Sequence, residues 1–310
     1  MNFLITGGAG FLGAALSNRL ARQGHHVRVL DDLSTGNPDA LDPEIHFNRG
    51  DINDRPKLWS LLEDIDCVYH MAARVSVPES ILFPRDYNIV NVGGTATLME
   101  AVRDAGTPRV VLTSSGAIYG DQPQPIMSES LPPHPHSPYA VSKLAAEWYV
   151  RTIGDLSGIK TVCLRIFNAY GPGQRIPASH PPIIPSFIRQ CRQNGTLVFH
   201  GDGTQTRDYV YVDDVVNALV SAATAPGLNQ QVINVGSGTE TSVRDLARLI
   251  IAITGSEPEE VFNPRMGGGV SRMKADISLA KEKLNYVPLI PLEMGLRLTI
   301  ERDPQFKNGF

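Results

Sequence analysis

The chain has 310 residues, which is long enough for one large α/β domain or two modest ones with a sizeable core. Its net charge of -4 gives no electrostatic case for a nucleic acid or an anionic membrane as a partner. The sequence contains no apolar run of membrane-spanning length, and residue 1 leads into an apolar run of strand type rather than a signal peptide. We therefore expect a cytoplasmic protein.

The three cysteines point to buried thiols. Cys67, Cys163 and Cys191 are odd in number, far apart and set in apolar surroundings. This pattern favours thiols in the core over disulfides or a metal site.

A glycine-rich turn follows the first apolar run. Residues 5–13 read Ile-Thr-Gly-Gly-Ala-Gly-Phe-Leu-Gly, and a helix-permissive run begins at Ala14. Gly8 and Gly10 are expected to let the backbone turn tightly against a pyrophosphate, and Gly13 to let the helix pack closely on the strand. The free N–H groups at the start of a helix favour a negative charge.

Asp31 completes the pattern of a dinucleotide site. It lies eighteen residues after Gly13, at the end of a second apolar run at residues 26–30. In this setting its carboxylate should accept hydrogen bonds from the adenine ribose hydroxyls and repel a 2'-phosphate. The pattern therefore predicts a dinucleotide site rather than a merely structural turn. Asp31 favours NAD over NADP as the dinucleotide.

Strand-like and helical runs alternate through the first half, which predicts a doubly wound parallel sheet with helices on both faces. The expected strands lie at residues 45–48, 67–70, 110–113 and 161–166, with helices at 84–105 and 139–153. Ligands in such sheets bind beyond the carboxyl ends of the strands. The residues to inspect there are Asp51, Ala72, Ala73, Ser114, Ser115 and Asn168.

The second half changes character after a segment rich in Pro and Gly at residues 172–185. It predicts a smaller lobe that covers the carboxyl edge of the sheet. The expected helices lie at 186–193, 212–223 and 243–254 and from about 291, with strands at 197–200, 208–211 and 232–235. We divide the chain at residues 1–170 and 171–310, with the elements near 212 and 232 expected to return to the main sheet.

Tyr139 and Lys143 are the strongest candidates for chemistry. Their spacing of four places both side chains on one face of a helix. A nearby ammonium stabilises a phenolate and lowers the pKa of a tyrosine, so the two residues can form a proton-transferring pair. The motif alone is weak because such pairs are frequent on helix surfaces. Its position downstream of a dinucleotide pattern, with Ser115 at the end of the intervening strand, favours the catalytic interpretation.

From residue 2 to about residue 300 the chain resembles the extended short-chain dehydrogenases/reductases of the nucleotide-sugar epimerase and dehydratase type. Ten stretches match in the right order, at residues 6–13, 31, 50–52, 70–73, 91–95, 113–120, 139–143, 164–171, 201–211 and 234–238. The resemblance implies a Rossmann domain that binds NAD and a lobe that binds a sugar nucleotide. It also implies that Tyr139 is the base, that Lys143 holds the nicotinamide ribose, and that Ser115 bonds the reacting sugar oxygen.

The resemblance also implies two sets of contacts. Asp51 and Ile52 would flank the adenine, within a cofactor set of Gly7, Gly10, Phe11, Leu12, Gly13, Asp31, Asp51, Ile52, Ala72, Ala73, Asn91, Tyr139 and Lys143. Asn168 and Arg207 would hold the sugar nucleotide, with its diphosphate facing Arg207.

Two arginines of the second half have physical reasons to bind a diphosphate, which needs cationic and preferably forked donors. Arg207 lies between a Gly-Asp-Gly turn and an expected strand; its alternative is a surface pair with Asp208 or Asp202. Arg272 follows a glycine loop that starts at Gly267, and its alternative is a solvated charge.

The residues after Ser115 narrow the reaction. Dehydratases of the family resemble one another in an Asp-Glu pair at this place, and decarboxylases carry a Glu at the second position, whereas this chain has Gly116 and Ala117. Neither side chain can donate or accept a proton, which favours 4-epimerisation over elimination. The alternatives are another sugar-nucleotide redox or lyase reaction, and a non-catalytic NAD-sensing module, which would be expected to have lost Tyr139, Lys143 or Ser115.

Arg175 separates two sugar classes. The stretch at residues 170–175 resembles that of uronate 4-epimerases, where an Arg holds the sugar carboxylate. Those relatives usually carry Thr at the position of Asn168. Neutral-hexose epimerases carry Asn there, as this chain does. We therefore expect a UDP-sugar substrate, UDP-glucose and UDP-galactose first and UDP-glucuronate as the alternative.

The expected helices at 84–105 and 139–153 carry more apolar surface than one sheet face need cover. The residues concerned are Leu98, Met99, Val102, Leu144, Trp148 and Tyr149. Relatives pair these helices as a four-helix bundle, so the resemblance implies a homodimer. The alternative is that these side chains simply pack on the sheet.

Overall fold

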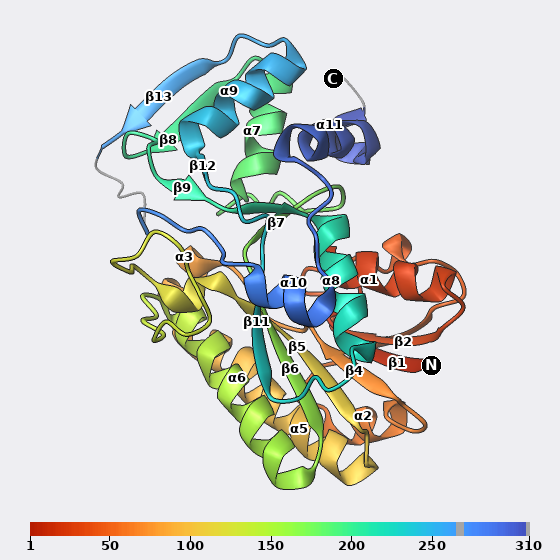
Figure 1. Cartoon of the computed structure of the whole chain (residues 1–310). Helices are drawn as coiled ribbons and strands as arrows, with labels where there is room; N and C mark the ends of the chain where they lie inside the picture. Colours follow the sequence, from red (N-terminus) through yellow and green to blue (C-terminus); the bar gives the residue numbers. More distant parts are fainter. Residues whose placement is uncertain (265–269, 308–310) are drawn as a thin grey trace.

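A computed structural model gives the fold and describes residues 1–264 and 270–307. Figure 1 shows a sheet with helices on both faces, and a smaller group of helices and short strands at one end of it. The sheet part corresponds to most of the first half of the chain.

The central sheet has seven parallel strands in the described residues, in the order β11-β6-β5-β4-β1-β2-β3. Their bounds are β1 Asn2–Thr6, β2 His26–Asp31, β3 His46–Arg49, β4 Cys67–His70, β5 Arg109–Ser115, β6 Lys160–Ile166 and β11 Gln231–Val235. The chain moves outward from β1 to β3 and then returns to place β4 beside β1. This reversal is the switch point at which doubly wound sheets bind ligands, and it confirms the predicted parallel fold.

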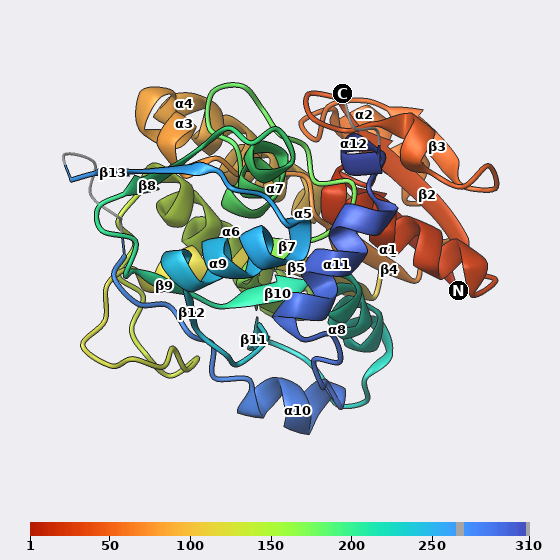
Figure 2. The same cartoon turned by 90° about the horizontal axis from the view of Figure 1, so that it is seen from above.

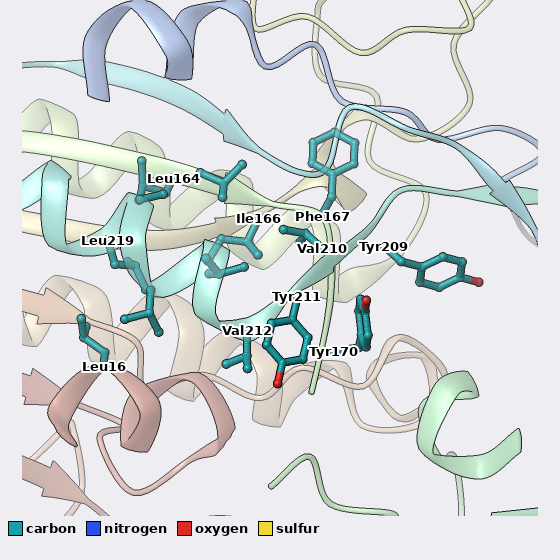
Figure 3. Close-up of a cluster of buried hydrophobic side chains, with 14 of the residues drawn as sticks. Leu16, Leu164, Ile166, Phe167, Tyr170, Tyr209, Val210, Tyr211, Val212 and Leu219 are labelled. Atoms are coloured by element: carbon teal, nitrogen blue, oxygen red, sulfur yellow. The ribbon is translucent and has the colours of Figure 1, made fainter. Parts of the chain in front are cut away.

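Helices cover both faces of the sheet and bury two separate cores. One face carries α1 (Phe11–Arg22) and α8 (Val212–Thr224), where Leu16 and Leu219 pack with strand residues such as Leu164, as Figure 3 shows. The other carries α2 (Arg55–Leu61), α5 (Gly94–Ala105) and α6 (Pro138–Ser157). Each fully buried Leu of this kind contributes roughly 1.5–3 kcal/mol. Cys67, Cys163 and Cys191 are free thiols within these cores, as predicted.

The structure has the helix expected over residues 84–105, with a change of winding inside it. It consists of α4 (Pro84–Tyr87), a π-helical segment at Asn88–Gly93, and α5. A separate α3 (Val77–Leu82) precedes it. The wider π turn contains Asn91, whose side chain bonds to the backbone of Arg74. A π segment interrupts a helix at a local cost and is often found near functional sites.

The smaller lobe consists of short elements. Its helices are α7 (Ile183–Arg192), α9 (Val243–Thr254), α11 (Leu292–Arg302) and α12 (Pro304–Lys307). Its strands form two pairs, β8 (Thr196–His200) with β13 (Glu259–Asn263) and β9 (Thr206–Arg207) with β12 (Thr241–Ser242). Figure 2 shows α7, α9 and α11 lying over the sheet when the molecule is viewed from above.

Elements of the second half return to the sheet part, as expected. β11 pairs with β6, and α8 packs against α1. The helix α10 (Ser278–Leu284) lies near them, and a third strand pair, β7 (Asn168–Tyr170) with β10 (Tyr209–Tyr211), leads into the lobe. The division at residue 170 stays a prediction.

Candidate active site

A cleft of about 2100 Å³ lies where the carboxyl ends of the strands meet the smaller lobe. Pockets for one small molecule are usually about 300–1,000 Å³. The cleft therefore has room for a dinucleotide and a second ligand. The expected cofactor residues along it are Gly7, Gly10, Phe11, Leu12, Gly13, Asp31, Asp51, Ile52, Ala72 and Ala73.

The glycine turn forms one wall of the cleft. Gly7 has φ +70°, and a Cβ there would lie 2.6 Å from the backbone nitrogen of Ala72. A Cβ on Gly13 would collide with the carbonyl oxygen of Gly7, so Gly13 allows the close packing of α1 that we predicted. Gly10 is the N-cap of α1 and brings no side chain to the free N–H groups of the first turn. These groups remain for an anion.

Gly8 has a different role from the one expected. A Cβ at Gly8 would lie 2.7 Å from both γ carbons of Val29, and Gly8 is outside the lining of the described cleft. The turn needs a glycine there to pack on β2. The close approach to a ligand comes from Gly7 and Gly10.

Asp31 lies at the end of β2 with its carboxylate partly satisfied by the backbone. It accepts from the amide nitrogens of Ala9 (3.0 Å) and Leu33 (2.9 Å). Burial raises the pKa of Asp31, and these two bonds act in the opposite direction. A carboxylate held this way at a cleft wall can accept further bonds from ribose hydroxyls.

Asn91 supports the loop after β4 and is outside the lining of the described cleft. Its carboxamide is buried and accepts from the Arg74 amide at 2.8 Å, while its nitrogen donates to the Arg74 carbonyl and to Ser142 Oγ. Its contact with the cofactor stays a prediction. That loop, through Ala72 and Ala73, does line the cleft.

Tyr139, Lys143 and Ser115 come together at the floor of the cleft. Ser137 caps α6 by accepting from the amide of Ala140 at 3.1 Å, which starts the helix one residue before Tyr139. Tyr139 and Lys143 follow on one face of this helix, and the Ser115 side chain lies near enough to Tyr139 to influence its pKa.

Burial governs the electrostatics of the pair. It raises the pKa of Tyr139, and the nearby Ser115 side chain only partly opposes this change. Lys143 is not among the groups that shift the pKa of Tyr139 here, so the lowering expected from its ammonium stays a prediction. Burial also lowers the pKa of Lys143 to about 8, against a raising contribution from Glu147.

Arg207 and Asn168 lie on the lobe side of the cleft. The Arg207 guanidinium donates to the carbonyls of Thr206 and Val270, both at 2.7 Å, and burial lowers its pKa. The alternative pairing with Asp208 finds no support, since Asp208 accepts from the amides of Ser237, Gly238 and Ala275.

The two other candidate arginines are engaged with other groups of the chain. Arg272 forms an ion pair with Glu240 and is outside the lining of the described cleft, and its assignment to the substrate site stays a prediction. The glycines 267–269 of its loop lie outside the described residues. Arg175 lines the cleft but donates to the Gly36 carbonyl at 3.0 Å, near Asp31.

Sequence reasoning missed one wall of the site. Thr196, Val198 and His200, on alternate positions of β8, line the cleft, while Leu197 and Phe199 between them are buried in the lobe. The period of two was readable in the sequence. Which face meets a ligand depends on how the lobe is packed.

Known proteins with a similar sequence or structure identify the family. The model of the NAD dependent epimerase/dehydratase family matches residues 3–236. The UDP-glucose 4-epimerase of Mycolicibacterium smegmatis is 38% identical, over 97% of this chain and 98% of that protein. A crystal structure of the UDP-glucose 4-epimerase of Thermotoga maritima with UDP-glucose superposes with a TM-score of 0.93, at 35% identity over 97% and 98% of the two chains.

A further solved structure is that of MoeE5 in complex with UDP-glucuronic acid and NAD, with a TM-score of 0.89 and 35% identity over 97% of this chain and 98% of that one. The strand order, the glycine turn and the Tyr139, Lys143 and Ser115 cluster agree with this assignment. The chain belongs to the NAD-dependent epimerase/dehydratase family.

Proposed function

We propose that the chain epimerises a UDP-sugar at C4' with NAD as its resident cofactor, and that UDP-glucose and UDP-galactose are the pair it interconverts. The proposal rests on the cluster of Tyr139, Lys143 and Ser115. It also rests on the two residues after Ser115, neither of which has an acidic side chain. Gly116 packs so closely that a Cβ would lie 3.2 Å from the ring of Phe167, and Ala117 carries only a methyl group. The site can therefore move a proton and support hydride exchange, but has no acid here for elimination.

The residues of the cleft fit NAD. Gly7, Gly10 and Gly13 leave a cradle that a Cβ would fill or distort, and the first turn of α1 offers free N–H groups to the pyrophosphate. Asp31 suits the adenine ribose, and Lys143 the nicotinamide ribose. When bound there, the nicotinamide supplies the site for reversible transfer of the C4' hydride.

Tyr139 takes the proton of the 4'-hydroxyl and later returns it. Its side chain is buried near that of Ser115 and both residues line the cleft, so both hydroxyls can face the same sugar oxygen. The Lys143 ammonium, one helical turn away, favours the phenolate form that the proton transfer requires. Lobe residues such as Arg207 hold the diphosphate while the sugar turns between its two faces.

Product analysis tests this proposal. Incubation of the purified protein with UDP-glucose, UDP-galactose, UDP-glucuronate and the dTDP and GDP analogues, followed by chromatography, should give the C4' epimer of a UDP-hexose most rapidly. A 4-keto or decarboxylated product would instead assign the chain to another reaction of the family.

A uronate substrate is the second candidate, supported by the similarity to MoeE5 and by the presence of Arg175. The position of Arg175 favours the neutral sugar. Its guanidinium is engaged with Gly36 on the loop after β2, near Asp31, which belongs to the side expected to hold adenosine.

We also propose that the chain is a cytoplasmic homodimer. Leu98, Met99 and Val102 do not support this, because all three are fully buried in the chain itself. Trp148 and Tyr149 do, since 58% and 44% of their surfaces are exposed on α6. No helix among the described residues is long and apolar enough to span a bilayer.

A further inference from the structure

A buried ion pair lies directly behind the catalytic helix face. Glu147 of α6 and Arg165 of β6 are joined at 2.9 and 3.0 Å, and only 2% and 6% of their side chains are exposed. Burying two charges costs solvation that their attraction often only offsets. Such a pair is therefore weak evidence for stability, which leaves room for a functional role.

Glu147 docks the catalytic helix onto the sheet. Its Oε1 accepts from Ser114 Oγ at 2.5 Å and from Arg165 Nε at 3.0 Å. Its Oε2 accepts from Arg165 Nη2 at 2.9 Å. Ser114 and Arg165 are direct neighbours on the parallel strands β5 and β6. One carboxylate on α6 therefore joins two strands, next to the strand position that carries Ser115.

The same carboxylate faces Lys143. Tyr139, Lys143 and Glu147 follow one another at intervals of four and so lie along one face of α6. The other titratable groups that face Lys143 are His70 of β4 and Cys163 of β6. Burial lowers the pKa of His70 to about 3 and raises the pKa of Cys163, so both are neutral.

Arg165 limits what Glu147 can do electrostatically, because it neutralises the same carboxylate. It also lies over the ring of Tyr119 at 4.8 Å, which fixes the guanidinium on the side away from solvent. Among the described residues, the Glu147 carboxylate is the ionised acidic group that raises the pKa of Lys143. The pair thus fixes the Glu147 carboxylate at a defined place without leaving an unpaired ion in the core.

We propose that Glu147 is a positioning residue of the active site, which sets the place of α6 on β5 and β6 and holds the Lys143 ammonium in its charged form. The proposal rests on the proposed epimerase function. Glu147 acts through Lys143 and contacts neither substrate nor cofactor.

The test compares Glu147→Gln with wild type by the pH dependence of kcat/KM for UDP-galactose. The loss of the charge should move the alkaline limb, expected near pH 8 in wild type, to lower pH by about one unit, as is typical when a nearby opposite charge is removed. Glu100→Gln is the matched control, because it makes the same change in the exposed Arg55–Glu100 pair (3.2 Å) and should leave the limb in place. A uniform fall in activity at every pH, without a shift, would show a merely structural role and overturn the proposal.

A second variant and a second readout cover the other outcomes. If Glu147→Gln does not fold, the double variant Glu147→Gln with Arg165→Met removes both charges and should show an acid shift that is smaller, because the loss of the Arg165 cation acts in the opposite direction. The titration of the Lys143 side chain can also be followed without turnover, by the ¹³Cε chemical shift assigned with Lys143→Arg. An unchanged Lys143 titration in the variant refutes the proposal, whereas a shifted titration in a protein that does not epimerise refutes only the proposed function.

Discussion

The substitution Tyr139→Phe isolates the proton-transfer step. The change deletes one hydroxyl from a buried side chain and keeps the ring, its helix position and its edge contact with Tyr87, whose centroid lies 6.4 Å away. The interaction with the nearby Ser115 side chain is lost. We expect the free energy of unfolding to change by at most about 1 kcal/mol, the usual net contribution of one hydrogen bond.

The effect on turnover should be much larger than the effect on stability. Loss of a positioned acid–base group typically reduces the rate by roughly 10²–10⁴, which corresponds to about 3–5 kcal/mol of barrier. The affinity for the UDP-sugar should stay near the wild-type value, because the diphosphate is held by the lobe. Initial rates from UDP-galactose, together with calorimetric titration of UDP-glucose, measure the two quantities separately.

Tyr87→Phe is the matched control for this experiment. Tyr87 is also buried and its hydroxyl is bonded to the Ser76 carbonyl (2.7 Å) and to Glu79, so the same atom is removed beside the site rather than in it. This variant should keep most of its kcat. Full activity of Tyr139→Phe, or an equal loss in both variants, would remove Tyr139 from the mechanism.

Four further outcomes are expected. Because the Lys143 ammonium is needed and burial lowers the pKa of Lys143 to about 8, activity should fall as pH rises through that value. Lys143→Ala should abolish this limb and weaken NAD binding, as a pH series with calorimetry would show. The protein should purify with NAD, whereas Gly13→Ala, whose Cβ would collide with the Gly7 carbonyl, should lose it; acid extraction that yields NADP from wild type would contradict the cofactor assignment. Arg175→Ala should leave the ratio of kcat/KM for UDP-glucose and UDP-glucuronate unchanged; a wild-type preference for the uronate above tenfold that disappears in the variant would reverse the choice of sugar. Trp148→Glu should convert a dimer into a monomer in light scattering, and a wild type that is already monomeric would exclude the homodimer.

The sequence by itself determined the features that depend on neighbours along the chain. The strand, glycine turn and helix around Gly7 to Gly13 are adjacent in sequence, so their local geometry follows from residue type. Tyr139 and Lys143 share one helix, so their spacing alone aligns them. Alternating strands and helices were enough to predict the parallel sheet, and the rule for its carboxyl edge located Ser115 at the site.

Only the tertiary structure decided what a long polar or charged side chain meets. Arg175 and Arg272 looked like similar candidates, but one reaches Gly36, 139 positions away, and the other pairs with Glu240 outside the cleft. The buried partner of Glu147 lies on a different element, so no local spacing could have identified it. A flexible cation can pair with any acceptor that the fold brings near. Burial, which raises the pKa of Tyr139, is likewise set by the packing of the whole chain and not by the residues next to it in the helix. Local spacing fixes which groups share a helix or a turn, whereas partners and solvation are properties of the packed chain.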